Sequence, residues 1–154
     1  MARAYSISTG NVALVAATAK TLIELPTSAN SGLDVVGFDF TFDATTAGSV
    51  VVEWGTFTTT GTGTAFTPTQ YNAAALVGNG GVASLVTGAK INDSVEPSGF
   101  AASGLPSIVI PLPNLLPYLW PQGRELHQGP SVKRALRFTS TIGCNARINL
   151  IFEE

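Results

Sequence analysis

His127, the only histidine of the chain, has the side chain best suited to acid–base or nucleophilic chemistry. Any Ser-His-Asp or Cys-His arrangement would depend on it. It lies in the segment Arg124-Glu-Leu-His-Gln-Gly-Pro130, whose Gly-Pro pair is typical of a loop. The sequence contains no Gly-x-Ser-x-Gly nucleophile elbow. We therefore expect His127 to be an exposed loop residue, and we expect a protein that has no catalytic residues and is not an enzyme.

The sequence offers no metal or cofactor site. One histidine and one cysteine, Cys144, are too few ligands for a zinc site, and a single cysteine forms no intramolecular disulfide bond. We expect Cys144 to be a small buried apolar residue. Asp39 and Asp43 lie on one face of an expected strand, but four residues at about 3.3 Å each separate them by about 13 Å, too far for a catalytic pair. Gly78-Asn-Gly-Gly81 lacks the Lys and Ser/Thr of a P-loop, so we expect a turn there, with no cofactor and no small-molecule substrate.

Targeting and membrane signals are weak. Arg3 is followed by polar residues and then by an apolar stretch of only Val12 to Ala17, which makes a poor signal peptide. The glycosylation sequon Asn92-Asp-Ser94 therefore has no secretory signal to support its use. The most apolar run, Ile108 to Trp120, is interrupted by prolines and falls short of the roughly 20 residues that a spanning helix needs. We expect no membrane insertion.

Charged residues are scarce in this chain. They make up 12% of the 154 residues, against about a quarter in a typical soluble domain. Residues 54–89 carry no charge at all, and neither do residues 97–123. The net charge of −2 lacks the basic excess of a nucleic-acid-binding protein. Because lipid is excluded by the prolines, we expect the uncharged surface to be covered by protein.

The charge is also unevenly placed along the chain. Residues 1–110 contain three basic and seven acidic side chains, whereas residues 111–154 contain five basic and three acidic ones. This asymmetry is consistent with ordinary solvated strand faces, and also with a basic end that faces an acidic partner surface. The sequence leaves both interpretations open.

The hydrophobic period is two rather than 3.6, which indicates strands. Val36, Phe38, Phe40 and Phe42 are expected to form the inward face of one strand. The same alternation predicts inward residues in four further strands: Ile23 and Leu25; Val50, Val52 and Trp54; Leu136 and Phe138; and Ala146, Ile148, Leu150 and Phe152. Turns rich in Gly, Asn, Asp and Pro separate these runs. The predicted fold class is therefore all-β: a single-domain antiparallel β-sandwich or barrel spanning residues 1–154.

Two segments do not read as ordinary strands. The Thr/Gly tract, Gly55 to Pro68, is expected to be a long exposed hairpin or loop. The Pro-rich segment, Leu105 to Pro121, holds five prolines, so it is expected to be extended and to lie outside any central strand. Asn72 to Gly104 is expected to be a long excursion between them, with Tyr71 to Val77 as its only helical turn.

These segments supply the residues predicted to contact a partner. Large aromatic side chains on a backbone stiffened by proline are typical anchors of protein interfaces, and they also cover a protein's own core. The predicted contact residues are Phe57, Thr60, Thr62, Phe66, Leu115, Leu116, Tyr118 and Trp120.

The two ends of the chain carry a resemblance to a known class. The opening, Tyr5 to Leu25, and the ending, Pro121 to Glu125 followed by Ala146 to Glu154, resemble small structural proteins of tailed bacteriophages, of the capsid decoration (cement) type. Residues 56–104 have no counterpart. The resemblance implies an all-β protein without catalytic residues. It implies binding to the major capsid protein on the outside of an icosahedral head, as a homotrimer, after synthesis in the host cytoplasm.

The sequence-level hypothesis is therefore a phage capsid decoration protein that stabilises the shell. One alternative is a carbohydrate- or surface-binding β-sandwich module of a virion fibre, which would expose Tyr71, Tyr118 and Trp120 along a groove. Another is a different virion component, such as a shell jelly roll, a tail tube or a head-completion protein. A further alternative is an enzyme, in which His127 would have to be the catalytic residue.

Overall fold

The structure, a computed structural model, describes residues 3–70, 84–103, 107–113, 115–119, 121 and 124–154. Within these ranges the chain forms strands and loops without a helix. The strands are β1 (Ala4–Ser8), β2 (Val12–Leu14), β3 (Ala19–Pro26), β4 (Leu33–Phe42), β5 (Gly48–Thr56), β6 (Thr62–Ala65), β7 (Thr69–Gln70), β8 (Lys90–Val95), β9 (Ala101–Ala102), β10 (Ile108–Leu112), β11 (Leu115–Leu119), β12 (Leu126–Gln128), β13 (Lys133–Ser140) and β14 (Cys144–Glu153). The predicted all-β class is confirmed.

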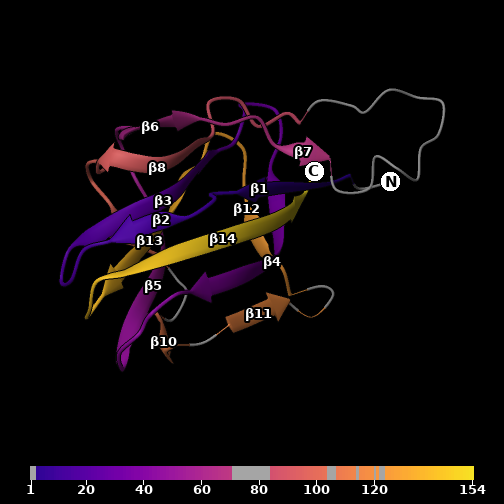
Figure 1. Ribbon diagram of the computed structural model, residues 1–154. Helices are drawn as coiled ribbons and strands as arrows, with labels where there is room; N and C mark the ends of the chain where they lie inside the picture. Colours follow the sequence, from indigo (N-terminus) through magenta and orange to yellow (C-terminus); the bar gives the residue numbers. More distant parts are fainter. Residues whose placement is uncertain (1–2, 71–83, 104–106, 114, 120, 122–123) are drawn as a thin grey trace.

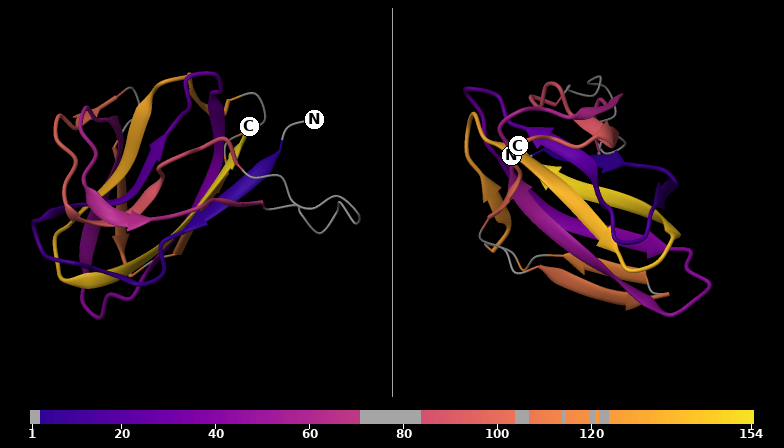
Figure 2. Two further views of the ribbon diagram at one scale, coloured as in Figure 1. Left: turned by 90° about the horizontal axis from the view of Figure 1, so that it is seen from above. Right: turned by 90° about the vertical axis from the view of Figure 1, so that its left-hand side faces the viewer.

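The strands form two antiparallel sheets that pack face to face as a sandwich (Figure 1). Sheet I has the order β11-β4-β14-β1-β7, with β12 also on β4 and β2 also on β14. Sheet II has the order β10-β5-β13-β3-β8-β6, with β9 also on β5. The two ends of the described chain meet, since the backbones of Arg3 and Glu154 exchange hydrogen bonds of 3.1 and 3.0 Å (Figure 2).

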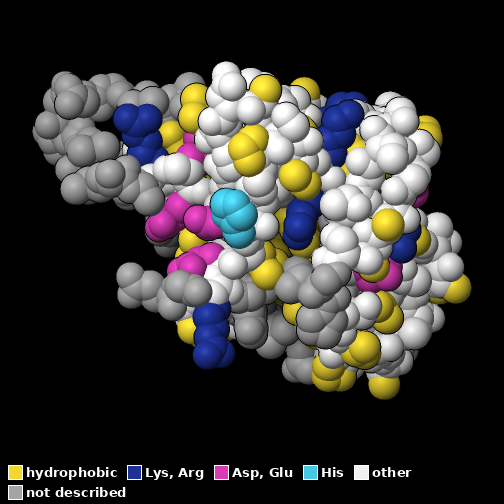
Figure 3. Space-filling model, turned by 180° about the vertical axis from the view of Figure 1, so that it is seen from behind, with side chains coloured by type: hydrophobic (Ala, Val, Ile, Leu, Met, Phe, Trp, Pro, Cys, Tyr) yellow, Lys and Arg dark blue, Asp and Glu magenta, His cyan; other side chains and the backbone are white. Residues whose placement is uncertain are grey.

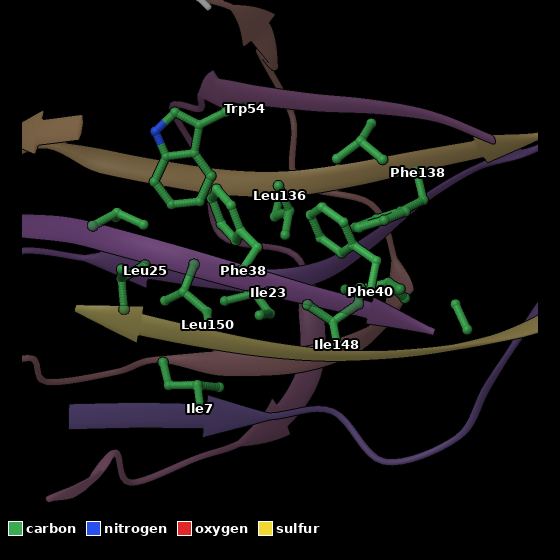
Figure 4. Packing of buried hydrophobic residues seen from close by; sticks show 14 of the residues in the cluster. Ile7, Ile23, Leu25, Phe38, Phe40, Trp54, Leu136, Phe138, Ile148 and Leu150 are labelled. Carbon is green, nitrogen blue, oxygen red and sulfur yellow. The ribbon is translucent and has the colours of Figure 1, made fainter. Parts of the chain in front are cut away.

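The core is rich in aromatic rings from facing strands (Figure 4). Phe40 of β4 stacks on Phe38, with ring centroids 5.4 Å apart, and meets the edge of Phe138 of β13 at 5.6 Å. Trp54 of β5 meets the edge of Phe38 at 6.0 Å. These rings join the two sheets, so the buried rows of β4, β5, β13 and β14 form one continuous core.

The inward row of β4 differs from the prediction at one residue. Ile151 of β14 lies opposite Gly37, and Phe152 lies opposite Val35, so Val36 is the extra residue of a β-bulge. The buried row therefore runs through Val35 and then Phe38, and the prediction that Val36 faces inward is wrong. A bulge of this kind re-aims every side chain that precedes it along the strand.

A second bulge lies in β3. Leu136 pairs with Ile23 and Arg137 with Thr21, which leaves Leu22 as the extra residue. The sequence pattern predicts that Ile23 and Leu25 are buried and that their neighbours in the strand are exposed. In the structure all residues from Thr21 to Leu25 are buried, so burial does not alternate along β3. The outward residue Glu24 is buried because other chain segments cover this part of sheet II.

The two unusual segments form strands at the ends of the sheets. Strands β10 and β11 of the Pro-rich segment are terminal strands of sheets II and I, and a cis peptide bond joins Leu112 to Pro113 between them. Pro111 and Pro117 lie within these strands, so the prediction that the prolines avoid central strands is confirmed for the described residues. The segment is extended, as predicted, but it forms paired strands rather than a Pro-rich loop.

The Thr/Gly tract is not a hairpin of its own. Its strand β6 pairs with β8, and an isolated bridge joins Thr59 to Ser98. The predicted excursion over Asn72 to Gly104 is likewise corrected, because it contains β8 and β9, both paired within sheet II. The predicted helical turn at Tyr71 to Val77 and the predicted turn at Gly78 to Gly81 lie outside the described residues.

We predict that Phe40→Ala lowers the free energy of unfolding by about 3–5 kcal/mol, because the ring is fully buried and its removal leaves a cavity between the sheets. Urea denaturation followed by tryptophan fluorescence measures the change. Leu119→Ala, at a side chain that is 67% exposed, should change the stability by no more than about 0.5 kcal/mol. Equal effects of the two substitutions would contradict this description of the core.

Candidate functional site

The two uncharged stretches of the sequence form the ends of both sheets. Strands β6 and β7 come from residues 54–89, and β9, β10 and β11 come from residues 97–123. The terminal strands of sheet I are β11 and β7, and those of sheet II are β10 and β6. In Figure 1, β6 and β7 lie along the upper side of the sandwich, and β10 and β11 lie along the lower side.

Terminal strands matter because the backbone of an edge strand can pair with a strand from another chain. Proteins usually protect such edges with charged side chains, proline or a covering segment. Strands β10 and β11 contain Pro111 and Pro117, which remove donors. Strand β6, with the sequence Thr-Gly-Thr-Ala, has neither proline nor charge. Strand β7, Thr69–Gln70, also lacks proline and charge, but β6 is the longer of the two. Strand β6 is therefore the stronger candidate for pairing with another chain.

The predicted contact residues fall into three groups. Thr60 and Thr62 are exposed at the β6 edge. Phe57 is only 6% exposed, and Phe66 packs against the core, so the structure places both within the chain's own fold. Leu115, Leu116 and Tyr118 lie in β11 opposite Thr41, Phe40 and Phe38, with only their backbone described, and Trp120 lies outside the described residues.

Two exposed apolar side chains at the opposite edge were not singled out from the sequence. Val109 of β10 is 62% exposed and Leu119 of β11 is 67% exposed. Both occur in the Pro-rich segment. Alternation identifies inward and outward residues only when the ends of the strand are known, and the sequence does not show where strands begin and end in this segment. On the face that Figure 3 shows, yellow apolar side chains are scattered among white atoms, with several dark-blue and magenta side chains between them.

The basic residues of the last third do not gather on one face. Arg137 of β13 donates to Glu53 at 2.9 and 3.1 Å, and its guanidinium lies 3.7 Å from the centroid of the Phe100 ring. Lys133 is exposed on sheet II, whereas Arg147 is exposed on sheet I. The charge asymmetry of the sequence therefore gives no single basic surface among these residues.

The candidate catalytic and ligand residues are ordinary surface groups. His127 lies in β12 rather than in a loop, and its exposed ring nitrogen Nδ1 is 2.7 Å from Asp34 Oδ1 (the histidine in Figure 3). Hydrogen bonds from Asn145 lower the pKa of the Asp43 carboxyl. No group of three or more His, Cys, Asp or Glu residues that could hold a metal occurs in the part of the chain that the structure describes.

The remaining predicted groups are also accounted for. Asp39 lies half-buried within β4, whereas Asp43 follows the end of that strand. Asn92 of the sequon is partly buried, and its amide nitrogen donates to the carbonyl of Thr9 at 3.0 Å. Cys144 is half-buried at the start of β14 and packs against the core, close to the expected apolar role.

Aromatic side chains give no described platform for a sugar. Eight of them are buried, and Phe66 and Phe100 are half-buried. The buried set is Tyr5, Phe38, Phe40, Phe42, Trp54, Phe57, Phe138 and Phe152. Tyr71 and Trp120 lie outside the described residues, as does the side chain of Tyr118.

A pair of buried carboxyl groups lies beneath the Thr/Gly tract. Glu24 of β3 is fully buried and Asp93 of β8 is 3% exposed. The backbone N–H of Gly61 donates to Glu24 Oε1 at 2.6 Å, and Lys90 Nζ donates to the carbonyl of Gly61 at 2.7 Å. The tract is thus bonded to the outer face of sheet II at a glycine.

The glycines of the tract are required by this close approach. A Cβ atom at Gly61 would lie 2.7 Å from Asp93 Oδ2 and 3.0 Å from Glu24 Oε1. A Cβ atom at Gly63 would overlap Asp93 Oδ1 and lie 2.9 Å from the carbonyl oxygen of Ile91. Only glycine lets the backbone pass this close to the two carboxyl groups.

Burial raises the pKa of Asp93 to about 8. Desolvation of the carboxylate is the largest cause, followed by the hydrogen bond with Glu24 and the negative charges of Glu24 and Glu96, while Lys90 acts in the opposite direction. The alternation of Ile23 and Leu25 puts Glu24 on the outward face of β3. The sequence has no signal that pairs it with Asp93, because their contact depends on strand order.

The chain was also compared with known proteins. No family model, curated protein or solved structure matches it. Among the described residues there is no helix long and apolar enough to cross a membrane.

We predict that Gly63→Ala destabilises the protein by about 1–3 kcal/mol, because the added methyl group has to displace the buried Asp93 carboxyl. Gly143→Ala is the matched control. Its Cβ would find its nearest neighbour, the carbonyl oxygen of Leu14, at 3.9 Å, so we expect a change within about 0.5 kcal/mol. Urea denaturation of both variants at pH 6 measures the difference, and a neutral Gly63→Ala would contradict the close approach.

Proposed function

We propose that this chain is a capsid decoration protein of the tailed-bacteriophage type, which binds the outer surface of an icosahedral head. One observation carries the proposal: the uncharged stretches of the sequence supply the terminal strands of both sheets. A chain so poor in charge at its edges is suited to lasting contact with protein on more than one side.

The two edges of the sandwich are suited to different contacts. Strand β6 offers an unprotected backbone edge flanked by the exposed side chains of Thr60 and Thr62. Strands β10 and β11 offer exposed Val109 and Leu119 beside prolines. Backbone pairing suits the first edge, and apolar side-chain packing suits the second. Two distinct edges allow one subunit to meet a sister subunit and the major capsid protein, as in the trimer that the resemblance implies.

The proposed mechanism is cementing. A protein that binds only the assembled shell stabilises it by mass action. A subunit that bridges neighbouring capsid proteins gains further, because its second contact is effectively intramolecular. This mechanism makes and breaks no covalent bond. It therefore requires contact surfaces such as the strand edges and no catalytic residues.

Heating shells that were assembled with and without this protein tests the mechanism. We expect the decorated shells to break at a higher temperature, and light scattering or DNA release reports the disruption. The number and location of copies in a purified particle give a second measure. Equal disruption temperatures, or a few copies at one vertex, would contradict the proposal.

We predict that Thr60→Lys with Thr62→Lys weakens binding to shells by about tenfold or more, equivalent to about 1.4 kcal/mol or more. Both threonines are exposed, so the fold should be retained, while two charges would have to be buried in the contact. Thr45→Lys with Thr46→Lys is the control, since it adds the same charge at exposed residues in the turn between β4 and β5. Co-sedimentation with shells measures binding. Equal binding by the two double variants would show that β6 is not the contact.

A further inference from the structure

Beyond its first two residues, which belong to β5, the Thr/Gly tract is hydrogen-bonded to sheet II and its loops along its length. At one end the backbones of Thr58, Thr59 and Ser98 exchange hydrogen bonds of 3.1–3.4 Å. At the other end β6 pairs with β8. Between them, Gly61 donates to Glu24 Oε1, which is the bond that ties the tract to β3. The middle attachment therefore depends on the state of the buried acid pair.

We propose that Glu24 and Asp93 share one proton and form a pH-sensitive latch, which holds the Thr/Gly tract against sheet II. Glu24 Oε2 and both Asp93 carboxyl oxygens are buried without a hydrogen-bond donor among the described residues. One proton on Asp93 supplies the missing donor, because its hydroxyl can donate to the Glu24 carboxylate. Two adjacent buried carboxylates cannot both stay ionised at low cost. When the shared proton leaves for solvent, the pair acquires two like charges under the tract.

The charged groups around the pair do not neutralise both carboxylates, so the shared proton is still required. Strand β3 contributes Glu24 and Lys20, and β8 with the loop after it contributes Lys90 and Glu96. Glu96 adds negative charge and is itself held by Thr21, whose N–H and hydroxyl donate at 2.7 and 2.6 Å. The positive charge of Lys90 lowers the pKa of the Asp93 carboxyl, against the other effects. The Nζ atom of Lys90 donates a hydrogen bond to the carbonyl of Gly61. The Thr/Gly tract contributes no charge.

The packing favours a proton over a metal ion as the group that neutralises the pair. The Gly61 and Gly63 backbones pass so close to the carboxyl oxygens that even a Cβ atom has no room there. The three unpartnered oxygens are shielded from solvent. A hydrated cation would need the tract to move away first, whereas a proton needs no space.

The direction of the pH effect follows from the raised pKa of Asp93, which is about 8 in the attached state. In the detached state the carboxyl returns toward its ordinary value of about 3.9. The attached state therefore holds one more proton between about pH 4 and pH 8, and attachment is strongest below that window. The ratio of attached to detached tract falls about tenfold for each pH unit within it.

Hydrogen exchange of the Gly61 amide, measured by NMR on the full chain, tests the latch. The protection factor, taken relative to the intrinsic rate at each pH, should fall by roughly 50-fold between pH 6 and pH 8 in the wild type. Asp93→Asn keeps a donor toward Glu24 but has no proton to lose, so its protection factor should change by less than about twofold. Asp39→Asn, the same substitution on sheet I, should keep the wild-type response.

Three results would overturn the latch. One is a wild-type protection factor that does not change with pH, and another is an Asp93→Asn variant that keeps the full change. The third is restored protection at pH 8 on adding calcium chloride, which would show that the pair holds a cation. If Asp93→Asn does not fold, the ¹³C titration of the wild-type Asp93 carboxyl decides, since titration below about pH 5 contradicts a shared proton. The latch concerns the chain alone and does not depend on capsid binding.

Discussion

The terminal strands of two open sheets are the constraint on which this structure depends. A closed barrel has no edges, whereas the two sheets described here end in β6 and β7 on one side and in β10 and β11 on the other. The aromatic rings that join the two sheets come from β4, β5 and β13, and β10 adds the buried side chains of Ile110 and Leu112 to the core. None of these four terminal strands contains a charged residue. The proposed capsid contact follows from that combination.

The sequence predicts the core more fully than the edges, for a physical reason. Strands β5, β13 and β14 each bury one face against a neighbour, so the period of two in their side chains identifies their inward rows. The alternation fails at Val36 and Leu22, where bulges insert one residue. A bulge is determined by pairing with another strand, which the local pattern does not contain.

The edges are hard to predict because their pairing is long-range. Thr62 pairs with Val95, and nothing in a Thr/Gly-rich segment specifies that partner. The sequence identified Thr60 and Thr62 correctly as exposed residues, since small polar side chains without charge fit an open surface. It could not separate Phe57 from them, because a lone aromatic residue beside a flexible tract is equally compatible with a core and with an interface.

The burial of the acid pair also depends on long-range contacts that the local sequence pattern does not contain. Alternation placed Glu24 correctly on the outward face of β3, but an outward face is solvated only when no other segment covers it. Here the covering segment is the Thr/Gly tract, and Gly61 and Gly63 permit its approach. One tract thus has two sides. Its backbone faces the acid pair, while the side chains of Thr60 and Thr62, on either side of Gly61, remain exposed. A latch that positions Gly61 also positions its two neighbours, so the protonation of Asp93 and the geometry of the proposed partner edge are physically linked.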